Sequence, residues 1–173
     1  MVFEEIVCSS EDERFMLEAI REAAAAAAEG EVPVGAVAVR NGEIIARAHN
    51  LVETAGRSGA HAEMLLLEEA EQAAGAKWLP DTTVYVTLEP CSMCAGAMVL
   101  ARIPRLVIGA NDPKTGACGS VMNIAANDRL NHRIEVVTGV LEEECSRQLR
   151  DFFRKRREEN KTLRENVRNA DVE

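Results

Sequence analysis

Hydrophobic and polar positions along the chain predict helices and strands in turn. Residues 9–30 begin with serines, continue through strong helix formers and stop at a glycine, which predicts a helix. The six consecutive alanines at residues 23–28 favour a helix that lies close to a sheet. Two β-branched, apolar runs then flank Asn41-Gly42, the strongest short signal for an antiparallel hairpin.

The rest of the chain alternates between helical and extended patterns. The expected elements are helix 61–74, strand 83–88, helix 91–101, strand 105–110, strand 134–138 and an increasingly polar helix at about 142–168. Because a strand, a helix and a second strand in succession form a parallel pair, the sheet is expected to be mixed. The pattern predicts a three-layer α/β/α fold with a five-stranded mixed sheet.

Length and composition agree with one globular domain. The 173 residues are 47% hydrophobic and 28% charged, which is ordinary for a folded domain of this size. We find no internal repeat and no linker, so a single domain is expected over residues 1–173. Its ends, at residues 1–10 and about 160–173, are expected to be flexible.

The start of the chain and its cysteines indicate a cytoplasmic location and no membrane association. The opening MVFEEIVCSSEDERF is acidic, and no run approaches the roughly 20 apolar residues of a membrane span. The cysteine count of five is odd and includes a C-x-x-C, which favours reduced thiols or metal ligation over disulfides. The net charge of −9 argues against nucleic-acid binding through the overall field, but it leaves room for a local basic patch.

Two expected helix starts carry candidate metal ligands. Pro90 suits the first position of a helix, which places Cys91 and Cys94 in its opening turn, on one face. A helix start also favours thiolate over thiol. With His61 at the start of the preceding helix, the set His, Cys, Cys is of the kind that binds zinc, one ion per chain. Three ligands leave a position for water, as in catalytic zinc sites.

Other interpretations of these cysteines stay open at this point. A lone C-x-x-C also suits redox exchange or half of a zinc ribbon, although the chain holds no second C-x-x-C. A closed structural zinc site needs a fourth ligand. The candidates for that ligand are Cys8, His49, Cys118, His132 and Cys145.

Glu63 has a structural and a catalytic interpretation. In the first turn of a helix, a glutamate is favoured by the helix dipole, with His61 as a capping residue. Beside a zinc site, its carboxylate is a candidate proton shuttle, which takes a proton from water and later passes one to departing ammonia. The second interpretation is favoured once Cys91 and Cys94 are considered.

The spacing of these residues resembles a known family. His61-Ala62-Glu63 and PCSMC at residues 90–94 match H-x-E…P-C-x-x-C, the signature of zinc nucleobase deaminases. The segments EVPVGAVAVRNGEIIARAHN, VYVTLEPCSMCAGAM, ARIPRLVIGANDPKTGACGS and DFFRKRR further resemble bacterial tRNA-specific adenosine deaminases. This resemblance implies a cytidine-deaminase-like fold, zinc, and a homodimer that converts the wobble adenosine of a tRNA anticodon to inosine.

The resemblance also implies roles for residues outside the signature. Asn50 matches an asparagine that contacts the flipped base, and Asp112 and Lys114 match a loop near the ribose and phosphates. Each also has a plain interpretation as a turn residue. Val34 and Leu88 either line the base pocket or belong to the core.

A basic segment near the C-terminus is the candidate RNA contact. Residues 147–157, RQLRDFFRKRR, hold six basic residues and one acidic residue. Phe153, Arg154 and Arg156 are expected to contact the tRNA anticodon stem-loop, since cations meet phosphates and an aromatic ring stacks on an unpaired base. The alternative is a solvated helix face.

Two rival functions share part of this pattern. A deaminase of free guanine, cytosine or a nucleoside has the same zinc site and Glu63 but less use for a basic segment. A non-enzymatic zinc-stabilised interaction module needs a fourth protein ligand and no particular glutamate.

Overall fold

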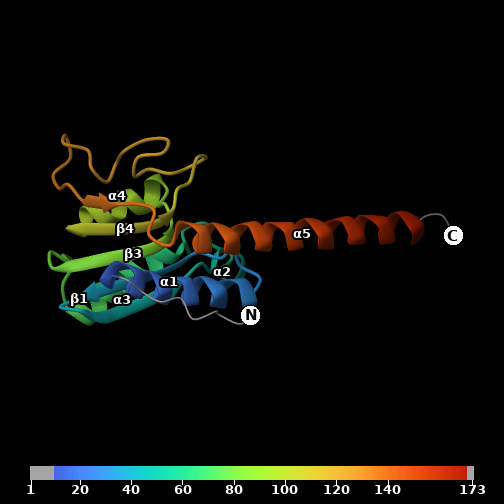
Figure 1. Ribbon diagram of the computed structural model, residues 1–173, viewed down its shortest axis with the longest axis horizontal. Coiled ribbons are helices and arrows are strands. Elements are labelled where there is room, and N and C mark those ends of the chain that lie inside the picture. The colour runs from blue at the N-terminus through green and yellow to red at the C-terminus, as the bar shows by residue number, and fades with distance from the viewer. Residues whose placement is uncertain (1–9, 171–173) are drawn as a thin grey trace.

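The architecture is a five-stranded sheet with helices around it, and the computed structural model describes residues 10–170 (Figure 1). The elements are α1 (Glu11–Ala28), β1 (Gly35–Arg40), β2 (Glu43–His49), α2 (Val52–Ala55), α3 (Ala62–Ala74), β3 (Thr82–Leu88), α4 (Ser92–Leu100), β4 (Arg105–Ala110), β5 (Glu135–Val137) and α5 (Glu142–Ala170). No helix in this part of the chain is long and apolar enough to cross a membrane.

The sheet is mixed, as the pattern predicts. Its strand order is β2-β1-β3-β4-β5, with β1 antiparallel to both of its neighbours and β3, β4 and β5 parallel to one another. The turn between β1 and β2 has positive φ at Asn41 (53°) and Gly42 (77°). Positive φ at both central residues is typical of the hairpin turn that matches strand twist, which confirms the hairpin.

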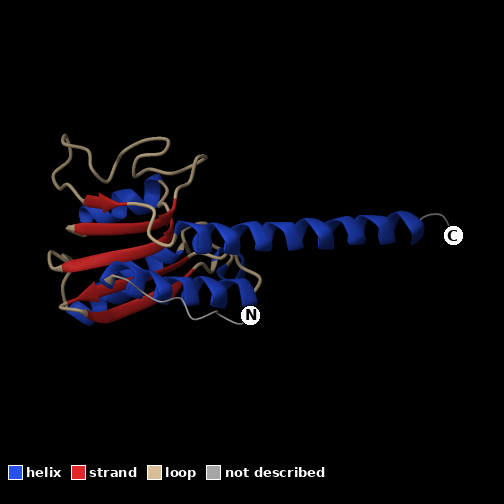
Figure 2. Ribbon diagram, viewed as in Figure 1, coloured by secondary structure: helices blue, strands red, loops and turns tan. Residues whose placement is uncertain are grey.

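Helices cover both faces of the sheet (Figure 2). On one face α3 and α4 pack through Leu66 and Met98 into the larger apolar core. On the other face α1 and α5 pack through Met16 and Cys145 against Val107 of β4. The three-layer α/β/α fold with a five-stranded mixed sheet is therefore confirmed.

The alanines of α1 allow that helix to lie directly on β1. A Cβ atom added to Gly35 would stand 2.2 Å from the Ala19 carbonyl oxygen and 2.3 Å from the Ala23 nitrogen. Ala19, Ala23 and Ala26 are all fully buried. The expected close approach of helix and sheet is confirmed, because only small residues fit at this contact.

The start of α4 differs from the prediction. The helix begins at Ser92, and Cys91 is its N-cap with an extended backbone (φ −71°, ψ 176°), so Pro90 is not the first helical residue. Tertiary contacts explain the shift, because the Pro90 carbonyl accepts the Ala117 N–H at 2.9 Å and Cys91 forms a β-bridge with Gly116. His61 is likewise the N-cap of α3 and not part of it.

Further differences concern short elements and the ends of the chain. The helix α2 has no counterpart among the expected elements, and β5 has three residues where five are expected. Residues 160–170 continue α5 as helix. The remaining residues of the expected flexible ends, 1–9 and 171–173, lie outside the described residues.

Candidate metal and catalytic site

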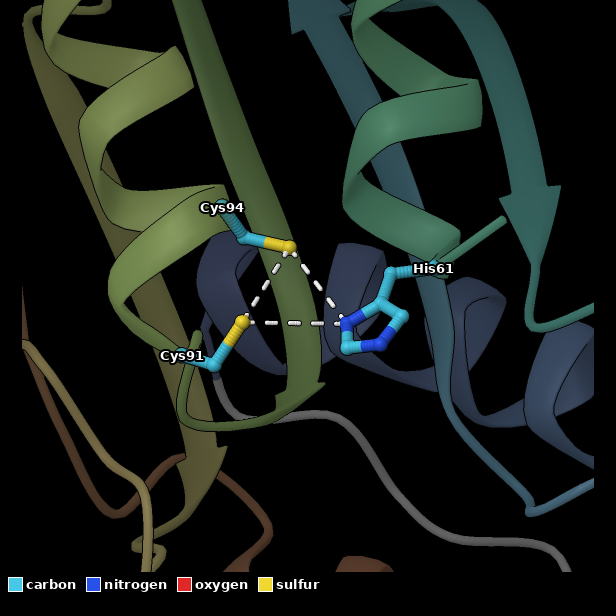
Figure 3. A group of neighbouring side chains, drawn as sticks. All are labelled: His61, Cys91 and Cys94. Atoms are coloured by element: carbon cyan, nitrogen blue, oxygen red, sulfur yellow. Dashed lines mark hydrogen bonds between the residues drawn. The ribbon is translucent and has the colours of Figure 1, made fainter. Parts of the chain in front are cut away.

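Three side chains suited to zinc converge at the edge of the sheet where β3 ends. His61 precedes α3, Cys91 precedes α4, and Cys94 lies in the first turn of α4. Since α3 and α4 pack on the same face of the sheet, their N-terminal ends meet at this edge. Figure 3 shows the two sulfurs on one side and the imidazole ring, pointing toward them, on the other.

The distances among the three ligand atoms suit a tetrahedral zinc ion. His61 Nδ1 lies 3.7 Å from Cys91 Sγ and 3.6 Å from Cys94 Sγ, and the two sulfurs are 3.7 Å apart. Zinc bonds of about 2.3 Å to sulfur and about 2.0–2.1 Å to nitrogen, at tetrahedral angles, require separations of about 3.8 Å between sulfurs and about 3.6 Å between sulfur and nitrogen. The three atoms therefore already stand where ligands of one ion belong.

The start of α4 favours the thiolate form of Cys91. Its hydrogen bond with Cys94 is the largest influence, and the backbone N–H groups of Cys94 and Met93 add to it, so that the pKa of Cys91 falls to about 5. A thiolate is the form that ligates metal. The expected effect of the helix start is thus present at Cys91, whereas the hydrogen bond with Cys91 and burial raise the pKa of Cys94.

The described candidates for a fourth protein ligand are not part of this group. His49 pairs with Glu22 of α1 and with Glu29, the C-cap of that helix, and the His132 ring lies 2.6 Å from the Ile103 carbonyl oxygen. Cys145 belongs to the core between α1 and α5, Cys118 is buried outside the ligand group, and Cys8 lies outside the described residues. Within residues 10–170, the potential metal-binding group consists of His61, Cys91 and Cys94.

Glu63 faces the same site from the first turn of α3. Its side chain is buried, and burial is the main cause that raises the pKa of Glu63 to about 7. The residue lines a cavity of about 270 Å³ together with His61 and Cys91. A carboxyl group that exchanges protons near neutral pH suits general acid and base catalysis.

The cavity brings some of the predicted substrate residues to the ligands and leaves others outside. Asn50, Asp112, Val34 and Leu88 line it. Lys114 does not line it; its backbone N–H donates to Asp112 Oδ1 at 2.9 Å within a turn. The remaining predicted RNA contacts belong to α5: Phe153, Arg154 and Arg156, all exposed.

Two buried carboxylates at this site have no role in the sequence analysis. The first is Glu31, whose oxygens accept hydrogen bonds from Asn50 Nδ2 (3.1 Å) and from the backbone N–H groups of Glu53 (3.2 Å) and Thr54 (2.6 Å). Burial raises the pKa of Glu31, but these bonds together outweigh burial and hold it below its usual range. Glu31 thereby orients the Asn50 amide and holds the start of α2.

The second is Glu89, immediately before Pro90. Its carboxylate accepts the backbone N–H groups of Asp112 (2.9 Å), Cys118 (2.9 Å) and Ser120 (3.0 Å), and also the Ser120 hydroxyl. Burial raises the pKa of Glu89, but the four hydrogen bonds outweigh it and the pKa lies below its usual range. The sequence signal that could have identified Glu89 is an acidic residue directly after a buried apolar strand and two positions before the candidate ligand Cys91.

Comparison with known proteins shows that this chain is similar to deaminases in both sequence and structure. The MafB19-like deaminase family matches residues 10–157. A tRNA-specific adenosine deaminase of Bacillus subtilis (strain 168) is 57% identical over 158 residues, which cover 91% of this chain and 98% of that protein. A solved structure from studies of A-to-I editing by tRNA:A34 deaminases has a TM-score of 0.76 at 42% identity, covering 79% of this chain and 99% of that one.

A guanine deaminase from Nitrosomonas europaea shares the fold at lower identity. Its TM-score is 0.72 at 26% identity, with 86% of this chain and 87% of that one covered. The fold alone therefore serves more than one substrate. The extent of the family match and the 57% identity show that this chain belongs to the family of tRNA-specific adenosine deaminases.

Proposed function

We propose that the protein is a zinc-dependent hydrolase that converts the wobble adenosine of a tRNA anticodon to inosine. The observation that carries this proposal is the His61, Cys91 and Cys94 triangle beside the buried Glu63, in a cavity that Asn50 also lines. The names of the relatives support adenosine in tRNA as the substrate.

The zinc ion and the side chain of Glu63 have separate roles in the proposed reaction. His61, Cys91 and Cys94 would hold the zinc ion, which would supply hydroxide near neutral pH as the nucleophile for C6 of adenine. Glu63 accepts one proton from the attacking water and passes it to a ring nitrogen; it then takes the remaining hydroxyl proton and passes it to the amino group, which leaves as ammonia. Its burial favours this exchange, because a pKa of about 7 lets the carboxyl both take and give a proton near neutrality.

The cavity has room for one base and not for a folded RNA. At about 270 Å³ it is at the small end of ligand sites, so the target nucleotide must leave the stack of the anticodon loop and enter alone. The Asn50 amide offers both a donor and an acceptor to the purine edge. Asp112, which also lines the cavity, is the candidate contact for the ribose.

The RNA outside the cavity would be bound through α5. Arg154, Arg156 and the 44% exposed Phe153 can meet phosphates and an unpaired base of the anticodon stem-loop. Such a surface has no purpose in a deaminase of free bases. We propose a cytoplasmic location, since that is where tRNA is a substrate.

We also propose that the protein is a homodimer with α4 at the interface. The sequence of α4, SMCAGAMVL, holds no charged residue, and a helix that is apolar on all sides is normally buried. Here Met93 (39%) and Leu100 (77%) are exposed. Replacing Leu100 with lysine is expected to shift the protein from dimer to monomer in analytical ultracentrifugation.

One experiment separates the proposed function from its rivals. The purified protein is mixed with deacylated tRNA, adenosine, cytidine or guanine, and ammonia and inosine are measured. Inosine at the wobble position supports the proposal, deamination of a free base supports the metabolic enzyme, and no ammonia from any substrate supports a binding module.

Metal analysis of variants completes this test. We expect about one zinc per chain in the parent, little in His61→Ala or Cys94→Ala, and an unchanged amount in Cys118→Ala. If Cys118→Ala also removes zinc, the site is closed and structural. If His61→Ala keeps its zinc, the ligand assignment is wrong.

A further inference from the structure

The basic residues of α5 form a regular stripe that runs past the family-matched part of the chain. Their spacing alternates between three and four positions, which keeps them on one face of a helix. The members described by the structure, all exposed, are Arg147, Arg150, Arg154, Arg157, Lys161 and Arg164. These six residues are called the basic stripe. At 1.5 Å per residue it is about 26 Å long.

The last part of the stripe lies beyond the family match. The match ends at residue 157, whereas α5 continues to Ala170. Lys161 and Arg164 are therefore a feature of this chain that the family profile does not include. Figure 1 shows this part of α5 projecting well away from the sheet and the other helices.

The stripe starts at the edge of the sheet that holds the candidate catalytic site. Cys145, in the first turn of α5, lies so close to Gly109 that a Cβ added there would be 2.4 Å from the cysteine sulfur and 2.9 Å from the Thr87 carbonyl oxygen. Thr87 and Gly109 are near the C-terminal ends of β3 and β4, and Cys91 follows β3. A molecule bound at the cavity therefore has α5 as its neighbour.

Charge complementarity identifies the partner of the stripe as a polyanion. The helix α5 holds nine of the 20 Lys and Arg residues but only seven of the 29 Asp and Glu residues, so the rest of the chain is strongly acidic. A helix that binds a membrane surface carries a broad apolar face. Residues 154–164 instead contain one large apolar side chain, Leu163.

We propose that Lys161 and Arg164 lengthen the RNA contact of α5 into a continuous phosphate-binding surface for tRNA, beyond the part of the helix that the family match covers. This inference rests on the proposed function, which brings the anticodon to the neighbouring edge. The ion pair between Lys161 and Glu165 (4.0 Å) does not prevent it, because exposed pairs are weak and exchange readily for phosphate.

The test compares salt titrations of tRNA binding for the full-length parent and for Lys161→Ala/Arg164→Ala. Losing two phosphate contacts should make the slope of log K against log salt shallower by about 1.4–1.8 and weaken binding on the order of tenfold at 0.15 M salt. Alanine favours helix, so α5 should persist. Circular dichroism and zinc content verify that the variant is folded.

A charge-matched control removes two cations at the opposite end of the body. Lys77 and Arg102 follow the C-terminal ends of α3 and α4, away from the site, so Lys77→Ala/Arg102→Ala should bind tRNA like the parent. If Lys161→Ala/Arg164→Ala binds tRNA with the same affinity and salt dependence as this control, while the parent forms inosine in tRNA, the proposed role of the basic stripe is wrong and the proposed function stands. If the parent neither binds tRNA nor forms inosine, both are wrong.

Discussion

Replacing Glu89 with glutamine tests whether one buried carboxylate holds the loop beside the candidate site. Glutamine keeps the size of the side chain but replaces one acceptor oxygen with an NH₂ group. If its oxygen retains the Cys118 and Ser120 N–H groups, the NH₂ group meets the Asp112 N–H, which now donates at 2.9 Å. The new NH₂ group and the Asp112 N–H, both hydrogen-bond donors, then face each other in a buried environment.

The magnitude follows from these contacts. A hydrogen bond to a charged group contributes about 1.5–3 kcal/mol, and a buried donor left without a partner costs about 1–3 kcal/mol. We therefore expect Glu89→Gln to lower the free energy of unfolding by about 3 kcal/mol. For a chain of this length the melting temperature should fall by about 6–12 °C.

The assay is denaturant unfolding followed by circular dichroism, at equal zinc content for both proteins. Glu69→Gln, on the exposed side of α3, is the matched control and should change stability by under about 0.5 kcal/mol. Because the folded pKa of Glu89 is depressed, its contribution is present above the unfolded pKa and is lost as pH falls through the folded pKa. A loss below about 1 kcal/mol at pH 7, or one that does not shrink in acid, would refute the reasoning.

Three further predictions address the catalytic carboxylate, the helix contact and an ion pair. Glu63→Gln should keep zinc and fold but lose at least about 100-fold in the rate of inosine formation, and activity within tenfold of the parent would contradict the shuttle role. Gly35→Ala should destabilise the protein, because the new Cβ would stand 2.2 Å from a backbone oxygen of α1; unchanged thermal unfolding would show that α1 can move. Arg105 donates to Asp12 at 2.8 and 2.9 Å and holds the Asp12 pKa below its usual range. That stabilisation is present above the unfolded pKa of about 4 and is lost as pH falls through the folded pKa, so the deficit of Asp12→Asn in urea titrations should shrink below about pH 4.

Local patterns in the sequence were sufficient for the strands, for every helix except α2, and for the ligand types. The Asn41-Gly42 hairpin and the alanine-rich α1 were predicted because turn chemistry and residue size act over a few positions. Cys91 and Cys94 were found for the same reason, since their spacing and the start of a helix are both local. The prediction that Pro90 begins the helix was wrong, because a distant loop pairs with Pro90 and Cys91.

The partners of buried polar groups required the tertiary structure. Glu89 binds N–H groups 23 to 31 residues away, and Glu31 orients Asn50 across 19 residues, so no local pattern gives the hydrogen-bond partners of either carboxylate. The tertiary structure also selects His61, Cys91 and Cys94 as the group of ligand atoms close to one another and leaves Cys118 out of it. Residue type and spacing fix what a side chain can bind, whereas the packing of α3 and α4 on one face of the sheet determines which side chains meet.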